Sequence, residues 1–252
     1  MRHQTGRYGW IPDLPDARDR MYRAPRKTAL PKSVDLRATC PKIYDQGDLG
    51  SCTANAIAAA IEFDQRKEKL AQTFTPSRLF IYYNERALEG SVSTDSGAML
   101  RDGIKSVASQ GACAEPMWPY VEQKFADRPP APCYKAGKLH PAVQYSRVPR
   151  DLGQLKACLA SGYPFVFGFT VYESFESDAV AHSGIASMPQ ADETALGGHG
   201  VMAAGYDDAH GRFLVRNSWG VDWGMGGYFT LPYAYLANAN LADDFWTIRV
   251  VR

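Results

Sequence analysis

The chain has 252 residues, of which 45% are hydrophobic and 22% charged, and its formal net charge is +1. This length predicts one large domain or two closely packed lobes, and the balanced charge gives no reason to expect nucleic-acid or membrane-surface binding. No stretch approaches the roughly 18 consecutive apolar residues of a membrane span. The first ten residues lack the apolar core of a signal peptide, so we expect a cytoplasmic protein or one secreted by another route. Fibrous, disordered and integral-membrane classes are excluded, and a monomer is expected.

Residues 1–29 differ in composition from the rest, with seven Arg or Lys residues and three Asp residues. Their prolines predict an extended arm, because proline is incompatible with the interior of a long helix. A basic tail of this kind is ordinarily solvated and disordered. Apolar side chains argue instead for docking, and we expect the arm to lie along the functional cleft through Tyr8, Trp10, Ile11 and Pro12.

Hydrophobic residues recur with a helical period between residues 51 and 111. A first helix is expected from Ser51, a second from Thr75 with its end at Gly90, and a third from Leu100 to Gly111. Four prolines between residues 124 and 142 predict a connector without regular structure.

The pattern changes to β beyond residue 150. A helix over 152–162 precedes a continuous apolar run at 165–172, which is typical of a buried strand. Strands at 201–206 and 212–216 flank a turn and predict a hairpin. The chain therefore reads as α+β, with a helical half, a β-rich half and a cleft between them as the natural site.

Cys52 opens the first expected helix. The unpaired N–H groups and the positive end of the helix dipole favour an anion there, so the thiolate form is expected to be stabilised. A thiolate is a strong nucleophile near neutral pH when a base lies beside it. The alternative is a buried, inert cysteine, which is the commoner situation for a single cysteine.

Three further side chains fit a thiol site. His199 lies among glycines, and Asn217 lies at the end of the following strand, where its amide oxygen can orient the imidazole. Gln46, six residues before Cys52, can direct an amide N–H at an oxyanion.

The chain contains five cysteines, an odd number, so any intramolecular pairing leaves at least one thiol free. There is no Cys-x-x-Cys pair and no Cys and His at zinc-ligand spacing, and neither a metal nor a cofactor is expected. Pairing is left open for the four residues other than Cys52, which are Cys40, Cys113, Cys133 and Cys158.

The blocks 46–52, 198–201 and 217–220 resemble the active-site blocks of the papain-like cysteine peptidases, in the same chain order. Residues 30–37 resemble the start of the mature enzymes, and the resemblance covers residues 30–252. It implies the papain-like two-lobe fold, with an arm at 1–29, a mainly helical lobe at 30–138 that carries Cys52, and a β-barrel-like lobe at 139–252 that carries His199 and Asn217.

The resemblance also implies roles for individual residues. Catalysis falls to Cys52, His199, Asn217 and Gln46, and Met99 lines an apolar pocket for the substrate residue two before the cut. The chain departs from the family at Leu49, where a disulfide-forming cysteine is usual, and at Thr53, where an aromatic residue is usual. Substrate binding is assigned to Gly97, Ala98, Met99, Gly198 and Trp219, with Ala98 in place of the family's second glycine.

The implied activity is hydrolysis of peptide bonds in peptide or protein substrates. Residues 53–139 contain no histidine, so no histidine-bearing occluding loop of the dipeptidase type is expected and an endopeptidase is favoured. The arm replaces a long helical pro-domain, resembles that of bacterial members with a short segment, and is interpreted as a pro-segment that blocks the cleft. Two alternatives remain, a catalytically silent peptide-binding module and an enzyme that transfers the acyl group to an amine.

Overall fold

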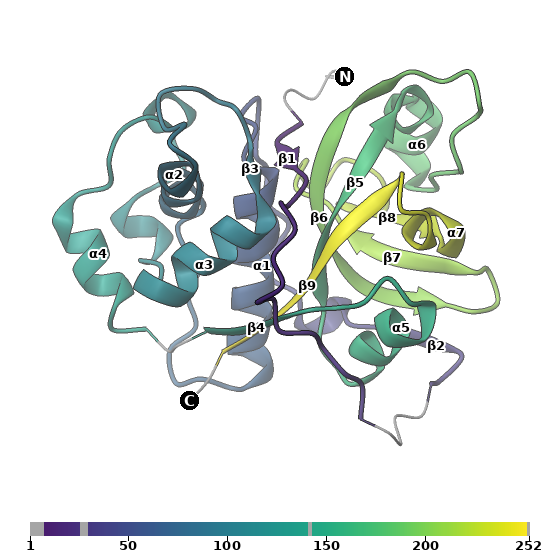
Figure 1. Ribbon diagram of the computed structural model, residues 1–252, viewed down its shortest axis with the longest axis horizontal. Helices are drawn as coiled ribbons and strands as arrows, with labels where there is room; N and C mark the ends of the chain where they lie inside the picture. The colour runs from purple at the N-terminus through teal and green to yellow at the C-terminus, as the bar shows by residue number, and fades with distance from the viewer. Residues whose placement is uncertain (1–7, 26–29, 141–142, 251–252) are drawn as a thin grey trace.

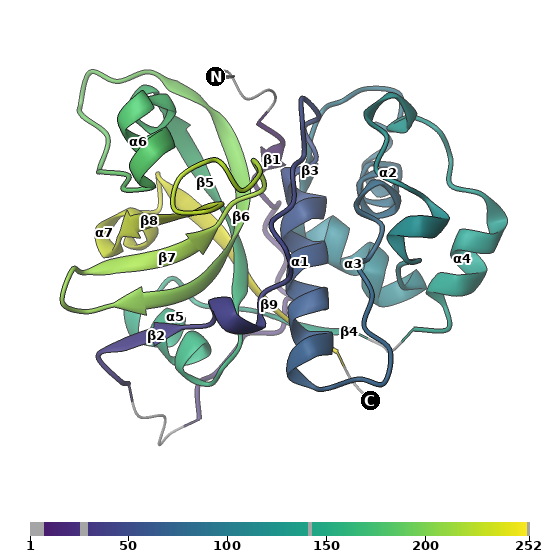
Figure 2. The same cartoon turned by 180° about the vertical axis from the view of Figure 1, so that it is seen from behind.

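The computed structural model describes residues 8–25, 30–140 and 143–250. Helices gather on one side of the molecule and a sheet on the other (Figures 1 and 2), in agreement with the expected α+β class. None of the described helices is long and apolar enough to cross a membrane. The α-helices are α1 (Cys52–Lys67), α2 (Arg78–Glu89), α3 (Leu100–Gln110), α4 (Ala131–Gly137), α5 (Leu152–Ala160), α6 (Asp178–Ser183) and α7 (Tyr233–Ala237), and the short 3-10 helices are η1 (Arg37–Thr39), η2 (Glu115–Met117), η3 (Glu122–Lys124) and η4 (Glu173–Glu176).

One antiparallel sheet of seven strands makes up most of the β-rich half. Its strands follow the order β4-β9-β5-β6-β7-β8, and β2 also pairs with β6. Over the described residues the sheet stays open, so the barrel-like lobe is an open sheet rather than a closed barrel. The strands are β1 (Trp10–Ile11), β2 (Ser33–Asp35), β3 (Ala98–Met99), β4 (Val143–Arg147), β5 (Phe165–Tyr172), β6 (Ala195–Asp207), β7 (Arg212–Arg216), β8 (Tyr228–Pro232) and β9 (Ala242–Val250).

Capping residues explain where the helices of the first half begin and end. The hydroxyl of Ser77 accepts a hydrogen bond from the Phe80 N–H at 3.1 Å. Ser77 is therefore the N-cap of α2, two residues after Thr75, where the cap is expected. The helix ends at Gly90, whose φ of 72° is readily adopted by glycine. Helix α3 ends before Gly111, as the sequence predicts.

Two segments differ from the expectations for their ranges. The predicted connector over 124–142 contains helix α4, which tolerates its proline because the first helical turn needs no N–H donor there. Strand β2 lies within the range assigned to the helical lobe, yet its residues 33–35 pair with residues 205–207 of β6 in the sheet. A three-residue strand shows too little alternation to be recognised from sequence.

All five cysteines are buried free thiols, which answers the open question of pairing in this structure. Cys113 and Cys133 nevertheless contact each other through a hydrogen bond between their side chains, where the end of α3 meets α4. The missing partner at Leu49 is therefore not replaced by another disulfide.

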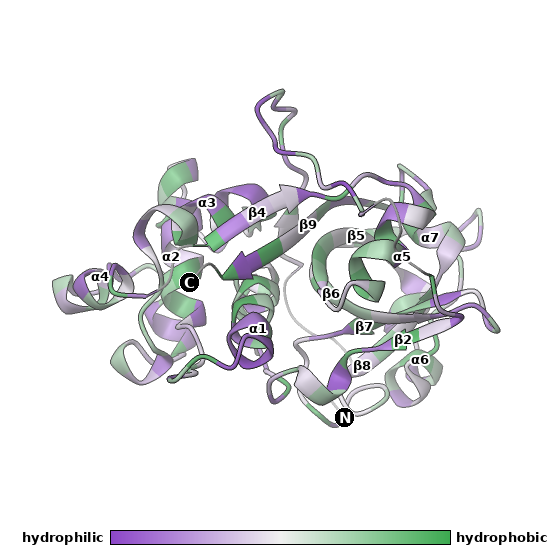
Figure 3. Cartoon of the chain, turned by 90° about the horizontal axis from the view of Figure 1, so that it is seen from below, coloured by the Kyte–Doolittle hydropathy of each residue, from purple (hydrophilic) through white to green (hydrophobic). Residues whose placement is uncertain are grey.

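The core of the β-rich half is a cluster of aromatic rings. Strand β5 is apolar on both faces, and the strands that carry the cluster are coloured largely hydrophobic in Figure 3. The rings of Phe167 and Phe245 stack with centroids 5.6 Å apart, and both side chains are buried. Such pairs add to the free energy gained from burial.

Replacing a ring at the centre of this cluster leaves a cavity that the sheet is unable to close. We expect Phe167→Ala to lower the free energy of unfolding by about 3–5 kcal/mol, measured by urea denaturation. Leu139→Ala, at a side chain that is 79% exposed, serves as the control and should change it by less than about 0.5 kcal/mol. Similar effects of the two substitutions would contradict this assignment of the core.

Candidate active site

Helix α1 delivers Cys52 to the junction between the helices and the sheet. The residue is the first of the helix, and its side chain is fully buried. The backbone N–H of Gly200 in β6 donates a hydrogen bond to the sulfur at 3.2 Å. The thiol therefore lies beside the strand that carries His199, although the two residues are 147 positions apart in the chain.

His199 is oriented by Asn217, as the sequence predicts. Its Nε2 lies 2.8 Å from Oδ1 of Asn217, and the same oxygen accepts the Ser218 N–H at 2.8 Å. Because this oxygen is an acceptor in both contacts, Nε2 carries the proton, and Nδ1 is left without a hydrogen-bond partner. The indole of Trp219 stacks on the imidazole with centroids 4.7 Å apart.

Gln46 is buried and held from both halves of the molecule. Its Nε2 donates to the carbonyl of Leu49 at 2.9 Å, and its Oε1 accepts from the hydroxyl of Ser218 at 2.7 Å. The Tyr120 hydroxyl donates to the backbone carbonyl of Gln46 at 2.8 Å. The side-chain amide has two N–H groups, so one is still available for a ligand.

The N-terminal arm runs between the helices and the sheet (Figures 1 and 2). Strand β1 pairs with β3 in parallel, with Trp10 opposite Ala98 and Ile11 opposite Met99. The carbonyl of Gly9 accepts the Ala98 N–H at 2.8 Å, and the N–H of Gly9 donates to the sulfur of Cys52. The arm therefore lies directly on the thiol.

Glycines on both sides make this approach possible. A Cβ at Gly9 would lie 1.7 Å from the carbonyl oxygen of Gly50, and a Cβ at Gly97 would lie 2.3 Å from the carbonyl oxygen of Gly9. Gly97 also has a φ of 75°. Of the expected substrate-binding residues, Gly97, Ala98, Met99 and Gly198 lie against the arm, whereas Trp219 lies on the imidazole.

Two of the four arm residues expected in the cleft do enter it. Trp10 is buried, and the Tyr8 ring lies 6.4 Å from the His199 ring between centroids, with its hydroxyl bonded to Glu176. Ile11 is exposed because successive side chains of an extended segment point in opposite directions, and Pro12, which follows the end of β1, is exposed as well. The segment 1–7 of the arm lies outside the described residues.

Beyond Pro12 the arm is anchored by hydrogen bonds to Asp13 and by an ion pair of Asp19. The Asp13 carboxylate accepts hydrogen bonds from the Arg101 N–H at 3.0 Å and from the Trp246 indole N–H at 2.8 Å. Asp19 pairs with the Arg101 guanidinium at 2.6 Å. Arg147 contacts both Asp13 and Asp19, at 3.4 and 3.7 Å. Sequence analysis did not single out this network, since the acidic residues of a mainly basic arm carry no recognisable motif.

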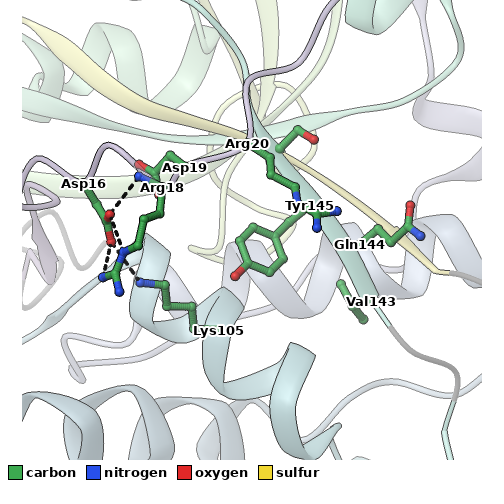
Figure 4. Close-up of a pocket in the computed structure, with 9 residues that line it drawn as sticks. Asp16, Arg18, Asp19, Arg20, Lys105, Val143, Gln144 and Tyr145 are labelled. Atoms are coloured by element: carbon green, nitrogen blue, oxygen red, sulfur yellow. Dashed lines mark hydrogen bonds and ion pairs between the residues drawn. The ribbon is translucent and has the colours of Figure 1, made fainter.

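A pocket of about 490 Å³ lies where this anchored part of the arm meets α3 and β4 (Figure 4). Asp16 pairs there with Arg18 at 2.8 Å and with Lys105 at 3.6 Å. None of the four residues expected to be catalytic lines this pocket, so it is separate from the thiol site.

Burial controls the charge state of the thiol and the imidazole. It raises the pKa of the Cys52 thiol to about 11 and lowers the pKa of His199 to about 4, against the opposing effect of the Asn217 hydrogen bond. The thiolate expected at the helix N-terminus is therefore not formed while the arm is docked, because desolvation outweighs the hydrogen bonds to the sulfur.

Comparison with known proteins places these features in context. The family model described as Papain family cysteine protease matches residues 30–245. The chain is 44% identical over 270 residues to the uncharacterized peptidase C1-like protein L477 of Acanthamoeba polyphaga mimivirus, across 97% of this chain and 87% of that protein. It is 30% identical over 235 residues to Cathepsin B-like CP3 of Giardia intestinalis, across 81% and 70% of the two chains.

Solved structures show the same similarity. Xylellain, a cysteine protease from Xylella fastidiosa, has a TM-score of 0.92 and 45% sequence identity, and the match covers 100% of this chain and 99% of that one. Digestive procathepsin L 3 of the Tenebrio molitor larval midgut has a TM-score of 0.75 at 20% identity, across 98% and 77% of the two chains. The second likeness concerns the fold alone.

The docked arm should protect Cys52 from alkylation. Burial raises the pKa of Cys52 to about 11, and the arm lies on the sulfur. We therefore expect iodoacetamide at pH 7.5 to label Cys52 at least about tenfold more slowly in the full chain than in a 13–252 chain. Peptide mass mapping measures the two rates, and the other four buried cysteines are internal controls. Equal rates for Cys52 in the two chains would contradict the protection.

Proposed function

The chain belongs to the papain family of cysteine proteases and is a thiol hydrolase, and we propose that Cys52 is its nucleophile and His199 its general base and acid. The observation that carries this proposal is the contact of the Cys52 sulfur with Gly200, next to an imidazole that Asn217 orients and whose Nδ1 is unpartnered. A nucleophile, a base and an orienting group in this relation are the components of covalent acyl transfer.

The proposed reaction follows from these positions. His199 Nδ1 takes the thiol proton, and the Cys52 sulfur attacks the carbonyl carbon of the scissile peptide bond. The free amide N–H of Gln46 and the N–H of Cys52, at the start of α1, donate to the oxyanion. The imidazolium then protonates the leaving amine, and water deprotonated by His199 hydrolyses the thioester. We propose endopeptidase activity as the default.

We also propose that the arm inhibits the enzyme without being cut. Gly9 presents its N–H to the sulfur, while its carbonyl is turned away to the Ala98 N–H. The Gly9 carbonyl oxygen is therefore bound by Ala98 and is not free to accept from the donors proposed for the oxyanion, which opposes cleavage at this carbonyl. Cys52 and His199 are in addition fully buried while the arm is docked, and this burial favours the neutral form of both groups.

The inhibitory and anchoring parts of the arm are separable. Residues 8–12 reach the thiol, whereas residues 13–25 pack on the body, where Tyr22 is buried and its N–H donates to the Arg147 carbonyl at 2.7 Å. A chain that begins at residue 13 therefore opens the cleft and keeps these contacts, which a chain that begins at residue 30 would lose.

The first test opens the cleft with one methyl group. Gly9→Ala places a Cβ where the Gly50 carbonyl oxygen lies, so we expect the arm to leave and hydrolysis of fluorogenic peptide amides to rise at least about tenfold over the full chain. The 13–252 chain should match it, and Cys52→Ala in either background should abolish hydrolysis.

Each of the other possible results would change a different part of the proposal. Equal activity of the full chain and Gly9→Ala would reject inhibition by the arm but retain the peptidase. Peptide binding without cleavage in both opened chains would favour the silent binding module. Products conjugated to an added amine, with little free acid by mass spectrometry, would favour acyl transfer.

Docking of the arm should weaken as pH rises. Burial, together with the neighbouring Asp244, raises the pKa of Asp13 to about 7 in the docked arm, above its ordinary value of 3.8. Protonated Asp13 therefore favours the docked form, fully below pH 3.8, and this contribution is lost as pH rises through about 7. The ratio of full-chain activity to Gly9→Ala activity should increase from pH 5 to pH 8.5.

The ratio cancels the pH dependence of the chemistry itself, which both chains share. Asp13→Asn is the matched control and should make the ratio nearly independent of pH, because the amide does not titrate. A ratio that falls with pH in the wild-type chain would contradict the role of Asp13.

A further inference from the structure

The Trp10 ring lies in a pocket that has room for it because two of the residues around the ring are glycines. A Cβ at Gly168 in β5 would lie 1.9 Å from the indole ring, and a Cβ at Gly198 in β6 would lie 2.8 Å from it. Any larger residue at Gly168 would therefore exclude the ring. The backbone beside Trp10 pairs with Ala98 of β3, so the pocket opens onto the segment expected to bind substrate.

Asp244 forms the polar end of this pocket. The Trp10 indole N–H donates to its Oδ2 at 3.1 Å, and the Asp13 N–H donates to the same oxygen at 2.7 Å. Its other oxygen, Oδ1, accepts from the Arg147 guanidinium at 2.7 Å. The residue is buried, and its φ of 57° places it in the left-handed region.

Departure of the arm changes the two oxygens differently. Oδ1 keeps Arg147, a residue of β4 in the body, whereas Oδ2 loses the indole donor and keeps the Asp13 N–H. Oδ2 then has room for a second donor, and an indole N–H buried in the pocket needs an acceptor. A substrate side chain that remakes this hydrogen bond is therefore preferred to one of the same shape that lacks the N–H. The structure already shows one side chain that fills the pocket and supplies that donor.

We propose that this pocket selects a tryptophan side chain in the substrate, with Asp244 as the specificity-determining residue that accepts its indole N–H. The inference rests on the proposed function and names the class of substrate for the same site. The ion pair with Arg147 neutralises much of the Asp244 charge, so a neutral donor fits better here than a second cation. The position concerned is the one expected two residues before the cut.

The test compares side chains that differ in one N–H group. The Gly9→Ala chain is given coumarylamide dipeptides whose first residue is tryptophan, 3-benzothienylalanine, leucine or arginine. Benzothienylalanine has nearly the shape of tryptophan but no N–H. We expect kcat/KM for tryptophan to exceed that for benzothienylalanine by roughly 10- to 100-fold. Equal values, or a higher value for arginine, would overturn the proposal.

Asp244→Gly removes the carboxylate and tolerates the positive φ, so it should bring tryptophan and benzothienylalanine to within about twofold of each other. Asp243→Ala is the matched control. Asp243 also pairs with Arg147, at 3.1 Å, but its side chain is 42% exposed, and the preference should persist in this variant. A preference that survives in Asp244→Gly would contradict the role of Asp244, and thermal melts check that both variants are folded.

Binding separates this inference from the proposed function. The Gly9→Ala chain that also carries Cys52→Ala cannot form an acyl-enzyme, so it binds peptides without cleaving them. The affinities of the same peptides for this chain are measured by competition binding. Tighter binding of the tryptophan peptide would support the pocket even if no peptide were hydrolysed, and equal binding would overturn it. Hydrolysis of leucine peptides without a tryptophan preference would retain the peptidase and reject this specificity.

Discussion

The N-terminus of α1 packs directly against β6 at Gly200, and the site depends on this contact. A Cβ at Gly200 would lie 3.3 Å from Thr53, so a glycine here lets the helix approach the strand closely. The approach brings the Gly200 N–H to the Cys52 sulfur and sets the thiol beside His199. Thr53 fits this junction as a small residue and donates to Glu85 at 2.7 Å, where the family usually has an aromatic ring.

The arm covers the thiol through the same kind of close packing. Backbone meets backbone at Gly9, Gly50 and Gly97, so the arm covers the thiol with little side-chain volume. In the structure with the arm docked, burial raises the pKa of Cys52 and lowers that of His199, the reverse of what an ion pair requires. The inhibition that we propose is thus steric and electrostatic together, and the raised pKa of the buried Asp13 is the basis of the pH dependence expected for it.

Much of the fold could be predicted because its elements have strong local signals. The apolar run at 165–172 is β5. The hairpin of β6 and β7 forms at the position that the glycine-containing turn between them predicts. Helix α4 was missed because its prolines are allowed only in a first turn, and β2 because its pairing with β6 is a contact across about 170 residues of chain.

The sequence by itself determined which groups we propose for the chemistry, since Cys52, His199 and Asn217 stand in distinctive blocks that follow one another along the chain in the family's order. Only the tertiary structure decided their charge state and what lies on them. Three features arise where segments distant in sequence meet. They are the burial of the thiol, the contact of the Asp244 carboxylate with Trp10, and the close approach of the backbones at Gly9 and Gly50. A pKa and a pocket are properties of such surroundings, which no local pattern of residues encodes.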